Sequence, residues 1–335
     1  MEFIKLPEHE KLDVFRQIRN EIGLSEAAVE KDWWVTAVLH ALFALPYSEH
    51  LSFKGGTSLS KCYNLIERFS EDVDIAINRE FFGFFGETFT VRQISKNLRK
   101  AACKFIRNKL QFDLARQMEE YGIPANLFSI KMNITPVTTI DPEKVFVEYK
   151  SVFSANPYIK NTVIIEISGR SMKEPLQEVE IRSFIDEYFP QALFTEQPFK
   201  INAVAPERTF LEKVCLLHEE FSKQDERIRV NRMSRHLYDL VRMSDMHIAE
   251  KALENRYLYQ SIINHRRMFI AIKDFDYDTL FPATVNIIPP QNVIEQWEED
   301  YSKMQTMIYG ESLSFNKLID RIKQLNEKIN RIKWQ

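Results

Sequence analysis

The stretch from Phe53 to Ile77, FKGGTSLSKCYNLIERFSEDVDIAI, decides how the rest of the chain is interpreted. It contains the only two adjacent glycines of the sequence, Gly55 and Gly56, directly after the short apolar run Leu51–Phe53. Two glycines interrupt an extended segment, and the polar residues after them begin a helical pattern. The helix dipole and the absent Cβ atoms favour a phosphate beside the backbone N–H groups of such a turn.

The second half of the stretch carries two carboxylates spaced one residue apart. The alternation Val, Asp, Ile, Ala, Ile over 73–77 predicts a strand, in which Asp72 and Asp74 point to the same face. Carboxylates this close repel each other unless a cation lies between them, and hard oxygen ligands suit Mg²⁺. A glycine pair and an Asp-x-Asp pattern are each common. Together, in the order strand, glycine turn, helix, strand, they indicate a site for a metal ion and a nucleotide.

The composition is that of a globular protein that folds without disulfides. The chain has 335 residues, of which 44% are hydrophobic, and its 48 acidic and 45 basic residues nearly balance. Its three cysteines are far apart, which favours a reducing cytoplasm. The N-terminus lacks the apolar core of a signal peptide. The most apolar window, 33–45, is about 13 residues long, below the roughly 20 that span a bilayer. We expect a cytoplasmic protein without membrane contact.

Periodicity predicts mixed helix and strand, of the α+β class. Two helices come first, over 3–20 and 25–45, the second with Ser25 as its N-cap. After the stretch 53–77 a long helix leads into a part that is rich in strands. That helix covers 91–121, and the strands cover 130–135, 145–153, 162–168, 178–184 and 199–205. The remaining chain is helical, with helices beginning at 206 and 234.

Glu166 lies inside the most apolar of these strands, Val163–Ile167. Burying a carboxylate costs several kcal/mol unless it is paired or bound to a metal ion. We therefore expect Glu166 to be a third carboxylate beside Asp72 and Asp74. The alternative is a solvent-facing position on an edge strand.

The long helix over 91–121 carries a concentration of positive charge. Its cations occupy a segment of eighteen residues without an acid, and they are Arg92, Lys96, Arg99, Lys100, Lys104, Arg107 and Lys109. Such a run is most often a solvated helix face. The alternative is a track for an RNA or DNA backbone, because closely spaced cations release counterions from phosphates.

Two later helices carry charged residues beside their apolar faces. Lys213, on the helix that begins at 206, is expected to point outward at the edge of the apolar face. Arg235 and Asp239 are four residues apart on the helix over 234–248, so they share a face and could pair with each other. Such a pair is worth about 0.3–0.5 kcal/mol when exposed.

The C-terminal third contains one regular apolar seam. Its members step by four and three residues over about two heptads, and they are Leu318, Ile322, Leu325, Ile329 and Ile332. The seam either docks on its own chain or binds a partner. Its short length favours the first, because short isolated helices are marginally stable.

Three motifs in this order resemble one protein family. They are FKGGTSLSKCYNLIERFSEDVDI, PERTFLEKVCLLHEEF at 206–221 and SRHLYDL at 234–240. They are similar to the motifs of the AbiEii/AbiGii toxin family, nucleotidyltransferase-like proteins of bacterial abortive-infection and toxin–antitoxin systems that include the MenT-type toxins. The resemblance implies a fold of the DNA polymerase β-like nucleotidyltransferase type. Residues 1–205 would form a mixed sheet with flanking helices, and residues 206–335 a helical domain that completes the active-site cleft.

The resemblance also implies roles for individual residues. Those expected to bind the nucleotide are Gly55, Gly56, Thr57, Ser58, Arg68, Ser70 and Arg235. Those expected to take part in catalysis are Asp72, Asp74, Lys213 and Asp239, with Lys213 at the triphosphate and Asp239 completing the site or acting as base. The metal ligands would be Asp72, Asp74 and Glu166, and the ion would be Mg²⁺, or Mn²⁺ in its place. The gap between Gly56 and Asp72 is longer than in the general superfamily motif, and no motif fixes the third acid.

The implied function is metal-dependent transfer of NMP from an NTP to an RNA acceptor such as a tRNA 3′ end, in a toxin–antitoxin or abortive-infection system for phage defence. The implied partners are the NTP, the RNA, and an antitoxin that is encoded alongside and need not bind the toxin. Two other functions stay open: a regulatory module that binds nucleotide or RNA without transfer, and a kinase-like enzyme that phosphorylates a protein. The Asp72/Asp74 pair favours transfer, because binding alone needs no paired metal-binding acids.

Overall fold

The chain forms two compact units in the computed structural model, which describes residues 1–70, 72–86, 88–154, 159–172 and 175–334. Unit 1 comprises Met1–Cys62 and Phe69–Val204, and unit 2 comprises Tyr63–Arg68 and Ala205–Gln335. The short segment 63–68, in the middle of the stretch Phe53–Ile77, therefore belongs to unit 2. Glu71 of that stretch lies outside the described residues.

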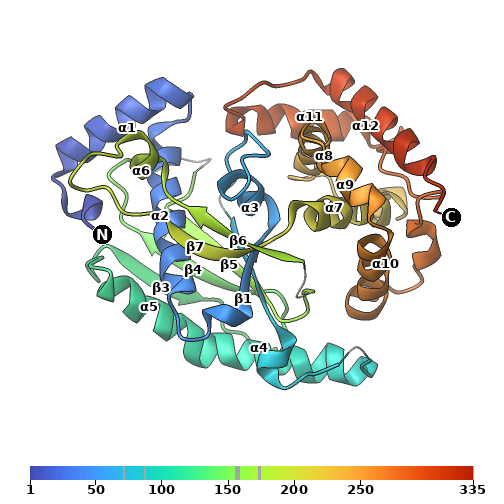
Figure 1. The fold of residues 1–335 in the computed structure, drawn as a ribbon, viewed down its shortest axis with the longest axis horizontal. Helices are drawn as coiled ribbons and strands as arrows, with labels where there is room; N and C mark the ends of the chain where they lie inside the picture. The colour runs from blue at the N-terminus through green and yellow to red at the C-terminus, as the bar shows by residue number, and fades with distance from the viewer. Residues whose placement is uncertain (71, 87, 155–158, 173–174, 335) are drawn as a thin grey trace. The chain divides into compact units, whose positions relative to one another are not determined.

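Unit 1 is built on a mixed sheet that has seven strands in the described residues, in the order β3-β4-β5-β2-β1-β7-β6 (Figure 1). The strands are β1 (Leu51–Lys54), β2 (Asp72–Ile77), β3 (Phe128–Met132), β4 (Glu143–Tyr149), β5 (Thr162–Ser168), β6 (Leu176–Ile181) and β7 (Phe199–Val204). β2 runs parallel to β5 and β1 parallel to β7, whereas the other neighbours are antiparallel. The mixed sheet and its flanking helices confirm the predicted α+β class.

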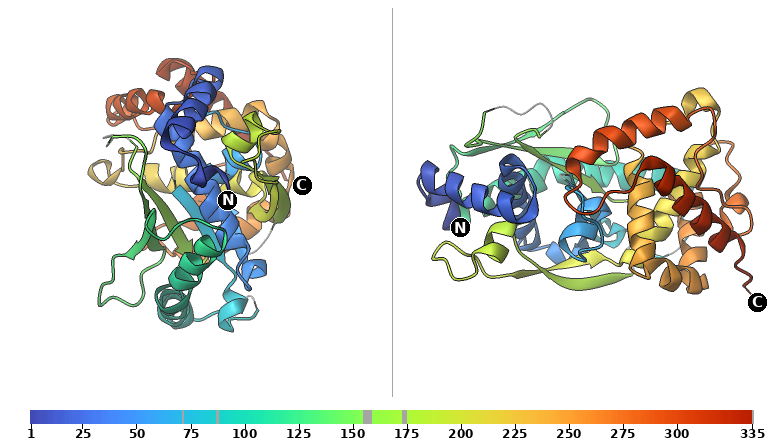
Figure 2. Two further views of the ribbon diagram at one scale, coloured as in Figure 1. Left: turned by 90° about the vertical axis from the view of Figure 1, so that its left-hand side faces the viewer. Right: turned by 90° about the horizontal axis from the view of Figure 1, so that it is seen from above.

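Helices surround this sheet (Figure 2). They are α1 (Glu8–Ile22), α2 (Glu26–Phe43), α3 (Gly55–Lys61), α4 (Arg99–Phe105), α5 (Gln111–Glu120) and α6 (Phe184–Tyr188), with two π-helical segments, η4 (Gln93–Leu98) and η5 (Ile106–Leu110), and the 3-10 turns η1 (Phe3–Lys5), η2 (Ser48–His50) and η3 (Arg79–Phe82). Ser25 caps α2 as predicted, because its side chain accepts a hydrogen bond from the N–H of Ala28 at 3.3 Å. The π segments and α6 were not predicted.

The core of unit 1 lies between α2 and one face of the sheet. α2 packs against β5 and β7 and is buried along most of its length. Trp34 of α2 stacks on Tyr149 of β4, with 4.9 Å between the ring centres. Tyr149 shares its face of the sheet with the buried residues Val145 and Val147, so α2 covers the apolar face. The other face is the one available to polar side chains.

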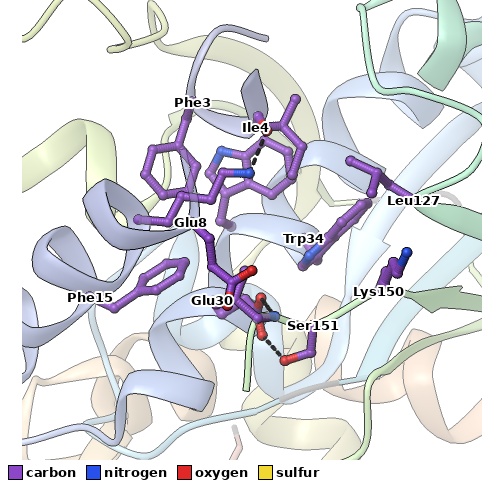
Figure 3. Close-up of a pocket in the computed structure, with 12 residues that line it drawn as sticks. Phe3, Ile4, Glu8, Phe15, Glu30, Trp34, Leu127, Lys150 and Ser151 are labelled. Atoms are coloured by element: carbon purple, nitrogen blue, oxygen red, sulfur yellow. Dashed lines mark hydrogen bonds between the residues drawn. The ribbon is translucent and has the colours of Figure 1, made fainter. Parts of the chain in front are cut away.

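A cavity of about 270 Å³ lies in unit 1 between η1, α1, α2 and the segment that follows β4 (Figure 3). Aromatic side chains such as Phe15 and Trp34 form its walls. The carboxylate of Glu30 accepts hydrogen bonds from the Ser151 hydroxyl and from the N–H of Val152, the second at 3.0 Å. Among the described residues, none of the predicted site residues lines this cavity.

Unit 2 is helical. Its helices are α7 (Pro206–Phe221), α8 (Arg235–Asp245), α9 (Ile248–Glu254), α10 (Arg256–His265), α11 (Ile294–Met304) and α12 (Phe315–Asn330), with the shorter segments η6 (Asp225–Arg227), η7 (Arg266–Ile270), η8 (Tyr277–Leu280) and η9 (Gln305–Met307). α12 packs against α8, and Leu318, Ile322, Leu325 and Ile329 of the predicted seam are buried. The seam therefore docks on its own chain, as its length favoured. No helix within the described ranges is long and apolar enough to cross a membrane.

Candidate active site

β2 presents Asp72 and Asp74 on one face of the sheet, as the alternation predicts. Both side chains are half-buried, whereas Val73 and Ile75 are fully buried. Val73 is in register with the buried Ile165 of β5, so these side chains belong to the apolar face that α2 covers. The two aspartates therefore lie on the opposite face and are partly exposed.

Gly55 lets the carboxylate of Asp74 approach the first turn of α3. Its φ of +81° lies in the left-handed region, which residues with a Cβ rarely adopt. A Cβ atom at this position would lie 2.9 Å from Cγ of Asp74 and would collide with its Oδ2. Two independent features therefore require glycine at position 55: its φ angle and the space that the Asp74 carboxylate occupies. The second feature connects α3 directly to the aspartate pair.

The hydroxyl groups that follow the glycines are used inside the fold. Thr57 is buried, and its hydroxyl lies 2.8 Å from Oγ of Ser70 and donates to the carbonyl of Asp72 at 2.5 Å. Ser58 is also buried, and its hydroxyl donates to the carbonyl of Gly55 at 2.9 Å. These bonds fix the start of α3 relative to β2. Because both hydroxyls donate within the fold, Thr57 and Ser58 would bind a phosphate through their backbone N–H groups. This role stays a prediction.

Glu166 lies beside Asp74, but it is not buried. The two residues are in register on the parallel strands β2 and β5. The burial of β5 alternates, and Glu166 falls on its half-exposed face, where Lys144 of β4 lies 2.5 Å from its Oε1. The expectation of a buried carboxylate is thus wrong, because the half-exposed Ile164 makes an alternating strand look like a continuous apolar run. Glu166 is next to Asp74 in the sheet but is paired with Lys144, and its role as a metal ligand stays a prediction.

In unit 2, Asp239 of α8 is the centre of a buried ion-pair group. It is 0% exposed and accepts hydrogen bonds from Nε and Nη2 of Arg68 at 2.7 and 2.8 Å. Nζ of Lys213 on α7 lies 2.9 Å from its Oδ2. Lys213 is itself 7% exposed, so the expectation that it points outward is wrong. Arg68 is held by this carboxylate through the segment 63–68, and its expected contact with the nucleotide stays a prediction.

These contacts determine the charge state of Asp239. Burial alone would raise its pKa, but the positive charges of Arg68 and Lys213 outweigh burial and lower the pKa. A carboxylate with a lowered pKa and with both oxygens bonded is a poor proton acceptor. The geometry therefore disfavours the predicted role as a base and favours a role in orienting Lys213. The value of a few tenths of a kcal/mol was expected for an exposed ion pair between Asp239 and Arg235. It does not apply, because Asp239 is fully buried.

His236 and Arg235 complete this group at the start of α8. Nδ1 of His236 lies 3.3 Å from Nζ of Lys213. Burial lowers the pKa of His236 well below its usual value, and the nearby charges of Lys213 and Arg235 lower it further. The imidazole is therefore neutral at physiological pH. Arg235 is half-buried, so it is the cation of this group with more access to solvent.

The sequence model of the family described as nucleotidyl transferase AbiEii toxin, type IV toxin–antitoxin system, matches residues 37–323. The chain belongs to this family. The match spans all three motifs, and the protein is a nucleotidyltransferase of the AbiEii type. No curated protein matches the chain.

Solved structures also resemble this AbiEii nucleotidyltransferase. One is JHP933 from Helicobacter pylori, with 18% identity and a TM-score of 0.41, covering 92% of this chain and 95% of that chain. Another is MenT4, a nucleotidyltransferase toxin from Mycobacterium tuberculosis, with 15% identity and a TM-score of 0.43, covering 97% of this chain and 99% of that chain.

The donor set of the AbiEii chain can be compared with the needs of a divalent metal ion. Among the described residues, no three His, Cys, Asp or Glu side chains are placed to hold a metal ion together. Asp72 and Asp74 nevertheless offer two hard carboxylates on one accessible face. Mg²⁺ is commonly bound by one or two carboxylates, with water and substrate phosphates as its other ligands. The aspartate pair fits such an ion, whereas a closed site made only of protein ligands is not present.

Two charged residues that hold α3 in place were not predicted. Lys61, the last residue of α3, lies 2.5 Å from Oδ1 of Asp32 on α2, and both side chains are buried. The other oxygen of Asp32 accepts a hydrogen bond from the N–H of Phe184 at 2.9 Å. This network fixes the end of α3, as Thr57 fixes its beginning. The available signal was the run of charges Glu30-Lys31-Asp32 inside an otherwise apolar helix.

Proposed function

We propose that this AbiEii chain transfers NMP from an NTP to the 3′ end of an RNA, with tRNA as the acceptor and Mg²⁺ as the metal ion. The observation that carries the proposal is the accessible Asp72/Asp74 pair, with Asp74 held against the glycine turn of α3. A fold that merely bound a nucleotide would have no need to keep two carboxylates so close together. The family supports nucleotidyl transfer as the type of reaction.

The reaction forms a bond between the acceptor hydroxyl oxygen and the α-phosphorus of the NTP. The bond from that phosphorus to the β-phosphate oxygen breaks, and pyrophosphate leaves. Asp72 and Asp74 would hold the metal ion, with Glu166 as the neighbouring carboxylate. When bound, such an ion neutralises charge on the phosphates and activates the hydroxyl. The chain's own contribution is position: Thr57, through its bond to the Asp72 carbonyl, and Gly55, through its fit to Asp74, set the two carboxylates.

Lys213 and Asp239 belong to the proposal through the family resemblance. Their geometry supports a division of labour within unit 2. Asp239 fixes the positions of Lys213 and Arg68, and the cations supply positive charge for a triphosphate. Arg68, Lys213 and Arg235 are the cations of this group, and Asp239 is the carboxylate that holds the first two. Asp239 would thus be a positioning residue, and the proton of the acceptor hydroxyl would not go to it.

The test is a labelling assay with purified protein, total tRNA, Mg²⁺ and each α-labelled NTP in turn. We expect label to enter RNA with one or more NTPs. Asp72→Asn and Asp74→Asn should each lower the rate at least about a hundredfold. Asp13→Asn is the matched control, since Asp13 is an exposed aspartate of unit 1 that pairs with Arg16. It should transfer at the parental rate. Full transfer by Asp74→Asn would contradict the proposal.

The same reactions distinguish the other two functions. Label from γ-labelled NTP entering a protein would indicate the kinase-like enzyme. A rise in melting temperature with nucleotide, without label transfer from any NTP, would indicate the regulatory module. Because tRNA and all four NTPs are present in the cytoplasm, we infer that the enzyme acts there.

We infer further that an antitoxin accompanies the enzyme, as the type IV family implies, and that it acts without a stable complex. Tagged enzyme expressed with the neighbouring gene product should purify alone while growth is protected. Stoichiometric co-purification would contradict this inference.

A further inference from the structure

A row of exposed side chains runs along the long helical segment that precedes β3. Its members are four residues apart, all are exposed, and they are Arg92, Lys96, Lys100, Lys104, Asn108 and Phe112. We call these residues the basic row. Figure 1 shows the segment along the lower edge of unit 1, in teal around the label α4.

The cations of the basic row have no acidic partner. Among the described residues, no ion pair involves Arg92, Lys96, Lys100 or Lys104, and the sequence from 91 to 112 contains no acid. Other cations of the same segment are neutralised, since Arg107 pairs with Glu143 at 3.1 Å and Lys109 with Asp113 at 2.8 Å. The exposed cations at four-residue spacing are thus the ones without an acidic partner, whereas Arg99, which also makes no ion pair in the described part of the chain, is half-buried and lies outside the row.

The helix geometry keeps the row together. Four residues make more than one turn of an α-helix, which has 3.6 residues per turn, so a long four-residue row gradually leaves one face. The two π-helical segments, η4 and η5, have wider turns and compensate for this drift. Successive members are about 6 Å apart along the axis, at 1.5 Å per residue. This spacing is of the order of the distance between successive phosphates of an extended strand.

An aromatic side chain follows the cations in the row. Phe112 is 63% exposed, so its ring is accessible to a base. Cations that follow a backbone, combined with an exposed aromatic ring on which a base stacks, are the two elements of single-strand recognition. A duplex or an acidic protein surface would make no use of the ring.

The basic row is connected to the strand beside the aspartates. A Cβ atom at Gly169 would lie 3.1 Å from Cβ of Ala102 and 3.8 Å from Cδ1 of Leu98, so the helix packs closely on the chain just after β5. Glu166, in register with Asp74, is three residues earlier, or about 10 Å along the strand. The helix lies against the end of β5, and a few nucleotides span the distance from there to Glu166.

From these observations we propose that the basic row binds a single-stranded segment of the acceptor RNA, with its cations on the phosphates and Phe112 under one base. This inference rests on the proposed function for the identity of the RNA. The row would increase the affinity for the acceptor and would leave the chemical step unchanged.

The test measures binding of fluorescein-labelled total tRNA by anisotropy at several salt concentrations. Lys96→Gln/Lys100→Gln/Lys104→Gln removes three cations without adding acids and keeps good helix formers. For a single strand the slope of log K against log salt is about −0.7 per neutralised phosphate, so the triple variant should reduce its magnitude by about 2. Phe112→Ala should weaken binding about tenfold without changing the slope.

The control is Lys5→Gln/Lys131→Gln/Lys200→Gln, which has the same change of net charge. These three exposed lysines of unit 1 pair with Glu2, Glu148 and Glu178. The control should bind tRNA as the parent does. An equal loss in the control, or an unchanged slope in the row variant with parental melting temperature, would overturn the proposal.

Labelling of tRNA by the same variants separates this inference from the proposed function. We expect the row variant to raise KM for tRNA at least fivefold while KM for the NTP and kcat stay the same. Active transfer with unaltered tRNA binding would overturn the basic row alone. Salt-dependent binding that is lost in the row variant, in a protein that transfers no label, would overturn the proposed function alone.

Discussion

Asp74 on β2 and Asp239 on α8 are both predicted site residues, but their surroundings are opposite. Asp74 is half-buried, lies next to a second aspartate and fits against a glycine. Asp239 has no exposure and holds two buried cations, Arg68 and Lys213. Two half-exposed carboxylates on one face of a strand are suited to bind a cation. A buried carboxylate with two cations is a structural requirement, because each charge would be left unpaired without the others.

The largest expected effect is that of Asp239→Asn on stability. Removing one member of a buried ion pair leaves the other charges unpaired and typically costs about 3–5 kcal/mol. Urea denaturation should show a loss of this size. Asp74→Asn should change the free energy of unfolding by less than about 1 kcal/mol, because Asp74 is half-exposed and interactions of exposed charges contribute little.

Asp245→Asn is the matched control for this experiment, since Asp245 lies on the same helix and makes an exposed ion pair with Arg321. It should cost about 0–1 kcal/mol. If Asp239→Asn were as stable as this control, the contrast between the two aspartates would be lost.

The second effect concerns Gly55 and should appear in activity. Gly55→Ala introduces strain at φ +81° and a collision with the Asp74 carboxylate. Gly23 has φ +77° with no atom within 4 Å of an added Cβ, so Gly23→Ala reproduces the strain without the collision. We expect each variant to lose about 1–2 kcal/mol of stability. Only Gly55→Ala should lose nucleotidyl transfer, by about a hundredfold. Equal activities would show that the contact with Asp74 has no role in catalysis.

The third effect is a pH dependence that belongs to unit 2. Burial and nearby cations lower the pKa of His236, so below about pH 6.5 the unfolded chain binds a proton at this residue that the folded chain does not. Stability contributed by the neutral imidazole is therefore present above pH 6.5 and is lost as the pH falls. The loss approaches about 1.4 kcal/mol per pH unit at most.

Urea midpoints at pH 7.5, 6.5 and 5.5 would measure this contribution. His236→Gln should be less sensitive to acid than the parent between pH 6.5 and 5.5. Identical profiles would mean that His236 takes up its proton at the same pH in the folded chain as in the unfolded chain. The cations around Asp239 would then act on His236 less than their positions imply.

How far the sequence predicts these two regions depends on the range of the interactions. Local rules were sufficient for the succession of strand, glycine turn, helix and strand around Gly55, for the shared face of Asp72 and Asp74, and for the Ser25 cap. They were insufficient for Asp239, because Arg68 lies 171 positions away and no short pattern connects them. Lys213 was misplaced for the same reason: its burial depends on a partner from another helix.

Two other differences concern the helices of unit 1. The long basic helix was predicted from its periodicity, but a pattern of 3.6 residues per turn contains no signal for its two π-helical segments. Lys61 and Asp32 were overlooked because a buried ion pair between two helices resembles, in the sequence, two unrelated surface charges. Their burial is visible only after α2 is known to be covered along most of its length.

The smallest expected effect distinguishes a metal ligand from an ion pair at Glu166. Glu166 and Lys144 form one half-exposed pair, so Glu166→Gln and Lys144→Gln should each cost about 0–1 kcal/mol in the free energy of unfolding. Both variants remove the same ion pair, but only the first removes a carboxylate next to Asp74. If Glu166 binds the metal ion, Glu166→Gln should raise the Mg²⁺ concentration for half-maximal transfer about tenfold or more, and Lys144→Gln should lower it slightly or leave it unchanged. If the two variants require the same Mg²⁺ concentration as the parent, Asp72 and Asp74 are the metal-binding carboxylates and Glu166 serves only to hold β4 beside β5.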